Sequence, residues 1–158
     1  MWRKAVRRVP STARIESVLL LGLGGGSAIN EVHTRFPSAQ IAVLEWDPVM
    51  VDLAHELKLF SESIKPDLLM GDAVELLPRL TQKFDLVLID LFKGETPEPR
   101  LSTPAMIISI AQILNPSGHI ILNAFKDVRL IEAFARHVEH LNTWRFRYDR
   151  LALYRPFS

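Results

Sequence analysis

The sequence contains no cysteine, no long apolar run and no large excess of either charge. Without cysteine, disulfides, thiolate nucleophiles and cysteine-bound zinc are excluded, and a reducing compartment is permitted. The 19 Lys and Arg residues against 18 Asp and Glu residues give a formal net charge of +1, so the chain as a whole has no bias toward nucleic acid or membranes. Its apolar runs fall far short of the roughly 20 residues of a membrane span. We therefore expect a cytoplasmic protein without membrane or nucleic-acid partners.

The apolar content is sufficient for one core. With 158 residues, of which 48% are hydrophobic, the chain suits a single domain. Residues 1–14 are predicted to be a basic N-terminal extension ahead of a domain of residues 15–158, and they lack the apolar stretch of a signal peptide. The cations of this extension are Arg3, Lys4, Arg7, Arg8 and Arg14. They suit a phosphate-binding arm or a solvated helix whose Trp2 and Val6 pack on the core, and the lack of a nucleic-acid motif favours the helix.

Hydrophobic periodicity alternates between two kinds of segment. Short apolar runs predict strands at 17–22, 40–46, 66–71, 84–92 and 118–125. Amphipathic stretches predict helices at 28–36, 47–57, 72–80, 103–114 and 127–141. The helix 103–114 is apolar almost all round and should be deeply packed. Strands that alternate with helices in this way form parallel βαβ units.

The last segment predicts a different connection. Residues 144–155, "WRFRYDRLALYR", indicate two strands around a tight turn near Asp149, and so short a connection permits only an antiparallel pair. Trp144, Phe146 and Tyr148 alternate as strand residues do, which favours packing against core and edge. The predicted fold class is therefore α/β: a doubly wound, mostly parallel Rossmann-like sheet that ends in an antiparallel hairpin.

The first predicted strand ends in a cluster of glycines. These are Gly22, Gly24, Gly25 and Gly26. Because glycine loses much backbone entropy on folding, such a cluster indicates positive φ angles or the close approach of another group. Ser27 stands where a G-x-G-x-x-G fingerprint needs its third glycine, but the spacing matches G-x-G-x-G. The loop is therefore either a tight structural turn or a backbone surface for a ligand.

An acidic residue ends each of three predicted strands. Glu45 ends the second strand, where a carboxylate can accept both hydroxyls of a ribose. Asp72 ends the third, and it can accept an adenine amino group, cap the next helix, or do both. Asp90 ends the fourth strand, which lies beside the first in such a sheet. Since ligands bind beyond the carboxyl ends of the strands, we predict one pocket formed by the glycine loop and these three acids.

Four segments carry a family resemblance: "VLLLGLGGGSAINEV", "IAVLEWDPVMVDLA", "LLMGDAVELL" and "FDLVLIDLFKGETPEPRLST". They resemble the nucleoside-binding core of the spermidine synthase family and its spermidine-synthase-like relatives, over about residues 17–125. The resemblance implies the class I S-adenosylmethionine-dependent methyltransferase fold, with the glycines near the methionine part of the cofactor and Asp90 at the reacting end. The cofactor-binding residues that it implies are Gly22, Leu23, Gly24, Gly25, Gly26, Glu45, Trp46, Asp72, Ala73 and Asp90.

Two motifs depart from the true aminopropyltransferases of this family. Gly25 replaces the aspartate that anchors the amine of decarboxylated S-adenosylmethionine, and Asp90-Leu91-Phe92-Lys93 replaces D-S-S-D. A lysine at this place repels a diamine. We therefore predict methyl transfer from S-adenosylmethionine to a small-molecule acceptor, with Asp90 as the catalytic residue. Aminopropyl transfer from the decarboxylated cofactor and a non-catalytic nucleoside-binding scaffold remain the alternatives, and a homodimer remains open.

Residues 93–104 form the longest predicted irregular stretch. Long loops in compact domains tend to be functional, so we predict a lid over the pocket or, alternatively, a static connection. The candidate substrate or lid residues are Phe92, Lys93 and Glu95. No metal site is expected, because His137 and His140 share a predicted helix face but lack a third ligand.

Overall fold

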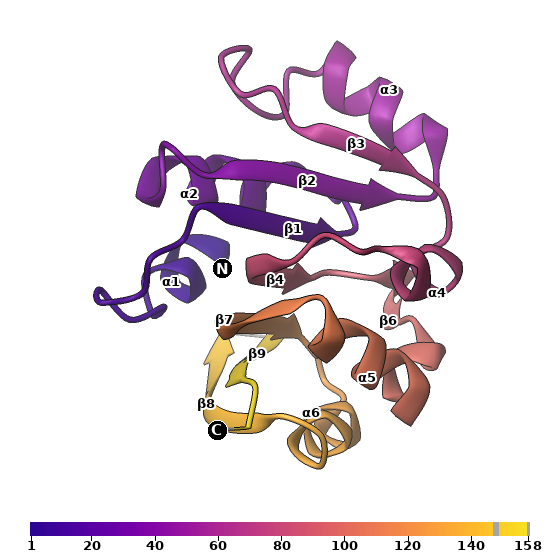
Figure 1. The fold of residues 1–158 in the computed structure, drawn as a ribbon. Helices are drawn as coiled ribbons and strands as arrows, with labels where there is room; N and C mark the ends of the chain where they lie inside the picture. Colours follow the sequence, from indigo (N-terminus) through magenta and orange to yellow (C-terminus); the bar gives the residue numbers. More distant parts are fainter. Residues whose placement is uncertain (147–148, 158) are drawn as a thin grey trace.

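A computed structural model describes residues 1–146 and 149–157, and its central feature is a seven-stranded sheet (Figure 1). The strands are β1 Ser17–Leu21, β2 Gln40–Glu45, β3 Asp67–Met70, β4 Phe84–Ile89, β7 Leu114–Asn123, β8 Glu139–Phe146 and β9 Asp149–Arg155. Their order across the sheet is β3-β2-β1-β4-β7-β9-β8. The first five of these strands pair in parallel, whereas β9 runs antiparallel to both β7 and β8. The predicted doubly wound sheet with a terminal antiparallel hairpin is confirmed.

Helices cover both faces of the sheet. The helices are α1 Trp2–Val6, α2 Ser27–Arg35, α3 Pro48–Glu56, α4 Ala73–Leu76, α5 Pro104–Gln112 and α6 Val128–Ala135, with 3₁₀ helices η1 Leu77–Arg79 and η2 Pro99–Ser102. One core cluster joins the sheet to α1, α2 and α3, and the other joins it to α4, α5 and α6 (Figure 1). The central strands are therefore buried on both faces, which explains their continuous apolar runs.

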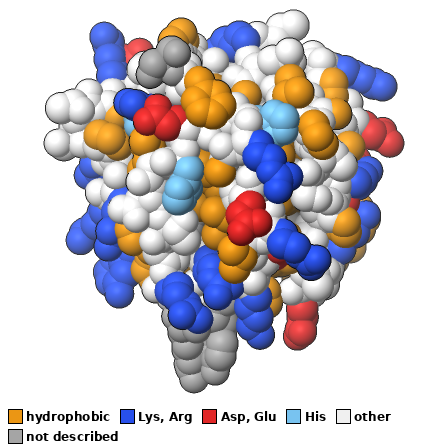
Figure 2. Space-filling view, turned by 90° about the horizontal axis from the view of Figure 1, so that it is seen from below, with side chains coloured by type: hydrophobic (Ala, Val, Ile, Leu, Met, Phe, Trp, Pro, Cys, Tyr) orange, Lys and Arg blue, Asp and Glu red, His pale blue; other side chains and the backbone are white. Residues whose placement is uncertain are grey.

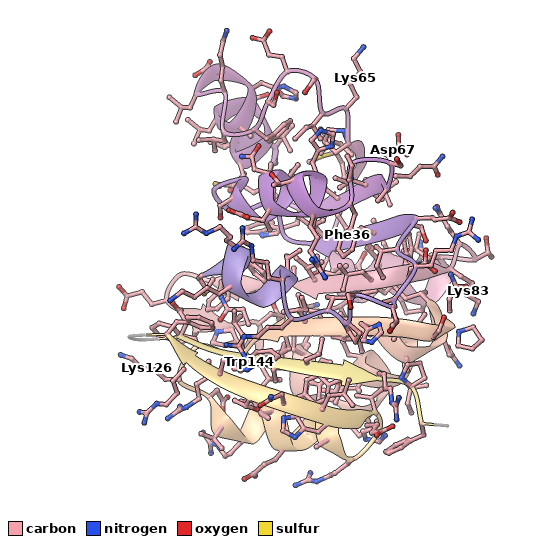
Figure 3. All side chains as sticks on the ribbon, turned by 90° about the vertical axis from the view of Figure 1, so that its left-hand side faces the viewer. Phe36, Lys65, Asp67, Lys83, Lys126 and Trp144 are labelled. Atoms are coloured by element: carbon pink, nitrogen blue, oxygen red, sulfur yellow. The ribbon has the colours of Figure 1, made fainter. Side chains whose placement is uncertain are left out.

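The register of the parallel strands brings their carboxyl ends to one edge of the sheet. Leu21, the last residue of β1, pairs with Leu44 of β2 and with Ile89 of β4. The glycine loop therefore begins between the ends of β2 and β4. Figure 3 shows the two edges far apart, because Lys83, directly before β4, and Lys126, shortly after β7, lie on opposite sides of the view.

The N-terminal basic segment packs as the helix that the sequence favours. Trp2 and Val6 of α1 are buried in the same core cluster as β1 and α2. The cation of Arg8 lies 4.7 Å from the centroid of the Trp144 ring on β8. Trp144 and Phe146 pack partly buried against this cluster, as expected. Tyr148, for which we made the same prediction, lies outside the described residues.

Two predicted helices differ from the structure. The helix predicted at 127–141 ends at Ala135, and Glu139 already pairs with Arg155 in the β8–β9 ladder. His137 and His140 therefore do not share a helix face, and His140 instead hydrogen-bonds Thr143 at 2.8 Å. The predicted helix is therefore present over Val128–Ala135, and its extension to residue 141 was wrong. From Glu139 onward, cross-strand pairing with β9 outweighs the helical spacing of the apolar residues.

The deep packing predicted for 103–114 is only partly correct. Helix α5 buries Met106, Ile107 and Ile110, but Ile108 is 43% exposed. A helix that covers one face of a sheet has a solvent side whatever its composition. Scattered exposed apolar residues of this kind are ordinary, and Figure 2 shows them dispersed among charged side chains on the face viewed from below.

The stretch 93–104 is not irregular. The short strands β5 Phe92–Lys93 and β6 Thr96–Pro97 form an antiparallel pair, and η2 follows. The amide of Glu98 donates to the carbonyl of Leu91 at 3.0 Å, and Leu101 is fully buried. These contacts join the segment to the core, although its sequence, rich in proline and polar residues, suggests a free loop.

Within residues 1–146 and 149–157, no helix has the length and apolar character to cross a membrane. Within the same residues, no group of His, Asp and Glu side chains forms a candidate metal site.

Candidate functional site

The glycine loop between β1 and α2 adopts the backbone that its sequence predicts. Gly22, Gly24 and Gly26 have φ angles of +91°, +51° and +67°, which strongly favour glycine. A Cβ at Gly22 would lie 2.5 Å from the backbone oxygen of Asp90, so the loop also lies tightly against the end of β4. Gly25 differs from the other three, because a Cβ there would meet no atom within 4 Å. A side chain at this position would therefore enter open space.

Glu45 holds the glycine loop in place. Its carboxylate accepts the amide of Leu23 at 2.8 Å, and also the amides of Trp46 and Asp47 at 2.8 and 2.9 Å. The residue is only 5% exposed, so it is not an acid on the solvent-exposed surface. Oε2 accepts only the Leu23 amide among these bonds and keeps the capacity to accept a hydroxyl. The ribose contact stays a prediction.

Asp72 caps α4, which confirms one of the two roles that we expected for it. Its Oδ1 accepts the amide of Val74 at 2.8 Å. Its Oδ2 accepts the guanidinium of Arg100 at 2.7 Å, a contact that the sequence did not indicate. Burial by itself would raise the pKa of Asp72, but the hydrogen bonds from Arg100 and Val74 hold the pKa below its ordinary value.

Glu98 joins Arg100 to Lys93. The Glu98 side chain is buried, and it accepts Nε of Arg100 at 2.8 Å and Nζ of Lys93 at 3.0 Å. The bond from Arg100 is the main reason that the pKa of Glu98 falls to about 2, so this carboxyl is ionised throughout the physiological range. Lys93, which we predicted as a substrate or lid residue, is therefore ion-paired.

The ion-paired residues Asp72, Lys93, Glu98 and Arg100 line part of a first pocket of about 240 Å³. Its lining residues are Leu44, Trp46, Gly71, Asp72, Ala73, Val74, Leu91, Phe92, Lys93, Glu98 and Arg100. Trp46 is 60% exposed although it lines the pocket, so one face of a large aromatic ring remains available. Of the predicted cofactor-binding residues, Trp46, Asp72 and Ala73 line this pocket, whereas the glycine loop, Glu45 and Asp90 do not. Arg100 is an addition that the sequence did not indicate.

Asp90 follows β4 directly and is mostly buried. Its Oδ1 accepts Nδ2 of Asn123, the last residue of β7, at 2.9 Å. Its Oδ2 lies against the glycine loop, because a Cβ at Gly24 would be 3.3 Å away. Burial raises the pKa of Asp90, and the charge of Asp149 adds to this, although bonds from Asn123 and Trp2 partly oppose it. A buried carboxyl with a raised pKa beside a cleft is suited to accepting a proton.

A second cavity, of about 510 Å³, adjoins Asp90 through Asn123. Its lining residues are Phe92, Glu95, Asn123, Phe125, Lys126 and Asp149. Phe92 lines both cavities, and its ring stands edge-on to Phe125 with centroids 6.2 Å apart. A wider groove of about 960 Å³ continues from Glu95 and Phe125 along the start of α6.

The site contains residues that sequence reasoning missed, namely Asn123, Phe125 and Arg100. Asn123 and Phe125 stand at the end of a predicted strand, which is the same position that drew attention to Glu45 and Asp90. Their neutral side chains gave no comparable signal. Arg100 was predicted to lie in a loop with no fixed partner.

Comparisons with known proteins agree on one family. The family model described as spermine/spermidine synthase domain matches residues 7–147. The polyamine aminopropyltransferase of Vibrio vulnificus (strain CMCP6) is 31% identical over 120 residues, which cover 74% of this chain and 40% of that protein. The eEF1A lysine and N-terminal methyltransferase of Bos taurus is 28% identical over 118 residues, which cover 68% of this chain and 17% of that protein. This chain thus spans less than half the length of these relatives.

A solved structure agrees with the fold. Human methyltransferase-like protein 13, in complex with SAH, matches with a TM-score of 0.81 and 22% sequence identity. The match covers 99% of this chain and 79% of that chain. At this identity the match establishes the fold alone, and it is the class I methyltransferase fold that the resemblance implied.

Proposed function

Because this chain belongs to the spermine/spermidine synthase domain family, we propose that it binds S-adenosylmethionine at the carboxyl edge of the sheet and transfers the methyl group to an acceptor. One observation carries the proposal. A pocket with an exposed Trp46 ring and the Asp72 carboxylate lies at the same edge of the sheet as the tight glycine loop and Asp90, and Phe92 lines both this pocket and a second cavity. The names of the methyltransferase relatives support it.

The residues present fit the cofactor. The loop backbone faces open space at Gly25, where a Cβ would meet no atom within 4 Å, whereas Gly22 and Gly24 lie tightly against Asp90. Oε2 of Glu45 accepts a ribose hydroxyl, and Leu23 and Trp46 line the same turn. Asp72 accepts the adenine amino group beside Ala73 and shares Oδ2 with Arg100. The cofactor supplies a methyl group already activated by its sulfonium, so the protein contributes mainly alignment.

Asp90 is the residue that we assign to the acceptor. Its raised pKa favours taking a proton from an acceptor held in the second cavity, while Phe92 and Phe125 form an apolar wall. Glu95 lines the same cavity. Lid motion is expected only at residues 93–97, because Glu98 and Leu101 are buried. A small-molecule acceptor remains our prediction. The groove of about 960 Å³ that continues along the start of α6 leaves space for a larger acceptor as well.

Aminopropyl transfer is the second candidate, and the polyamine aminopropyltransferase relative is the reason to keep it. Against it, Gly25 offers no carboxylate for the amine of the decarboxylated cofactor, although the space for one is open. Lys93 stands where a diamine would dock, but its charge is shared with Glu98. A non-catalytic nucleoside-binding protein remains the third candidate.

Calorimetric titration with S-adenosylmethionine, its decarboxylated form and S-adenosylhomocysteine tests the proposal. We expect the carboxylated cofactor to bind more tightly than the decarboxylated one. Gly25→Asp should reverse this preference, because the new carboxylate attracts an amine and repels the carboxylate of the cofactor, whereas the control Gly25→Ala should not. Tighter binding of the decarboxylated form to the unchanged protein, with turnover of putrescine, would establish aminopropyl transfer instead.

A further inference from the structure

We propose that Asn123 is a positioning residue that orients the Asp90 carboxylate and, with the other end of the same side chain, fixes the cavity wall at Phe125. The proposal rests on the proposed function, because it assigns the acceptor to the second cavity. It adds a residue that the sequence did not single out.

The orientation of the Asn123 amide follows from its two partners. Asn123 is 4% exposed, so its polar atoms depend on protein partners. Its Oδ1 accepts the backbone amide of Phe125 at 3.0 Å, and its Nδ2 donates to Oδ1 of Asp90 at 2.9 Å. A backbone N–H only donates, so it determines which end of the asparagine faces Phe125. The donor end is thereby directed at Asp90.

Phe125 has a backbone conformation that needs such support. Its φ of +50° lies in the left-handed region, which is unfavourable for a bulky side chain. The bond to Asn123 secures this turn, and the turn places the Phe125 ring edge-on to Phe92 in the cavity wall. The Asn123 side chain therefore links the Asp90 carboxylate to Phe125 in the wall of the second cavity.

The charges around Asp90 give Asn123 a second effect. Asp149 from β9 raises the pKa of Asp90, and Glu95 and Lys126 are the other charged residues lining the cavity. Among the groups that lower this pKa, Asn123 has the larger effect and Trp2 of α1 the smaller. Loss of the asparagine donor should therefore raise the pKa of Asp90 further.

The test compares substitutions at Asn123 with one at Asn115. Asn115 donates to Asp85 at 2.7 Å at the opposite edge of the same two strands, so Asn115→Leu is the matched control. The pKa of Asp90 is measured by nuclear magnetic resonance, from the carbon shift of its side-chain carboxyl during a pH titration. We expect Asn123→Leu to raise this pKa and Asn115→Leu to leave it unchanged.

Asn123→Asp separates the two roles and guards against a variant that does not fold. Its carboxylate still accepts the Phe125 amide but is a second acid beside Asp90, so the two carboxyls share a proton and the pKa of the pair should rise more than in Asn123→Leu. The Phe125 amide should exchange with solvent about tenfold faster only in Asn123→Leu, the loss expected for about one hydrogen bond.

An Asp90 pKa that stays the same in Asn123→Leu or rises equally in Asn115→Leu, or a Phe125 amide that exchanges equally fast in Asn123→Asp and Asn123→Leu, would refute the positioning role. S-adenosylhomocysteine binding distinguishes this from a failure of the proposed function. If the unchanged protein does not bind this ligand, the function is wrong whatever the titration shows. If it binds, and Asn123→Leu binds within about threefold, an unmoved Asp90 pKa rejects the positioning role alone.

Discussion

Two asparagine–aspartate pairs join β4 to β7, one at each edge of the sheet. At the amino edge, Asn115 donates to Asp85 at 2.7 Å, and at the carboxyl edge Asn123 donates to Asp90 at 2.9 Å. The strands, the residue types and the direction of the bond are the same in both pairs. The pKa of Asp85 is nevertheless lower than the ordinary value of an aspartate, whereas the pKa of Asp90 is higher.

The number of donors explains the difference. Oδ2 of Asp85 accepts the amide of Glu16 at 2.9 Å and both the amide and the hydroxyl of Ser17 at 3.0 and 2.9 Å, in addition to the bond from Asn115 on Oδ1. Burial would raise the pKa of Asp85, but these donors together lower it. Asp90 is more deeply buried and has fewer donors, and Asp149 stands nearby.

The comparison separates a structural acid, Asp85, from Asp90, for which we propose a role at the acceptor. Asp85 has its hydrogen bonds satisfied within the fold, so its charge stabilises the amino edge. Asp90 retains unused acceptor capacity at an edge with two adjoining cavities, and its burial costs stability. Such a cost is typical of residues retained for binding or catalysis.

The largest change in free energy should come from Asp85→Asn, which tests whether Asp85 stabilises the fold. The new amide nitrogen faces donors from either Asn115 or Ser17, so at least one buried donor loses its acceptor. We expect the free energy of unfolding in urea to fall by about 3 kcal/mol, the scale for losing bonds to a charged acceptor. Cofactor affinity should not change, since Asp85 lies at the other edge.

The sequence predicted the carboxyl-edge acids and not the amino-edge acid for a physical reason. Strand ends can be located from apolar runs, so the amino-acid pattern alone assigns Glu45, Asp72 and Asp90 to one edge. Asp85 lies within the predicted strand 84–92. Its low pKa and its structural role depend in part on bonds from Ser17, which is 68 residues away in the sequence. Contacts of this kind depend on strand register, which hydrophobic periodicity does not specify.

The same limit applies to the other missed features. Arg100 reaches Asp72 across 28 residues, and the β8–β9 ladder determines where α6 ends. The glycine loop could be predicted because its cause is local: positive φ angles favour glycine at three positions whatever the distant contacts are. Local rules therefore gave the fold class and the strand-end residues, and tertiary pairing gave the partners of those residues.

Glu45→Gln should have the next largest effect, at the functional edge. An amide provides one acceptor oxygen where the carboxylate has two, and its nitrogen must face the amide of either Leu23 or Trp46. We expect cofactor affinity to fall by about 2–3 kcal/mol, or roughly 30- to 150-fold, measured by calorimetry. Stability should also fall, by about 1 kcal/mol, because Glu45 holds the loop.

Glu16→Gln is the matched control at the amino edge, because the Glu16 side chain is exposed and pairs only with Arg14 among the contacts described. It should alter neither quantity. If Glu45→Gln leaves cofactor affinity unchanged while stability falls, Glu45 is a structural acid like Asp85, and the proposed ribose contact is wrong.

The smallest effect should come from Asp90→Asn, and its sign should be opposite to that of Asp85→Asn. An amide at position 90 still accepts from Asn123 but carries no charge to bury. We expect relief of this buried charge to outweigh the weakened bond from Trp2, so the free energy of unfolding should rise, by less than about 1 kcal/mol. Methyl transfer should fall, while cofactor affinity should stay within about threefold, because Asp90 is assigned to the acceptor.

The pH dependence of this gain tests whether the buried charge causes it. Because the folded-state pKa of Asp90 is raised above its ordinary value of 3.8, the charge costs stability above that folded pKa, and the cost disappears as the pH falls from there toward 3.8. The stability gained in Asp90→Asn should therefore be present at pH 7 and disappear on acidification.

The penalty of Asp85→Asn should persist to lower pH, since the folded pKa of Asp85 lies below 3.8 and the contribution of its charge is lost only as the pH falls through it. Urea titrations of both variants at several pH values measure the two trends. Parallel trends would mean that the two edges share one electrostatic character, and the assignment of Asp90 to chemistry would lose its basis.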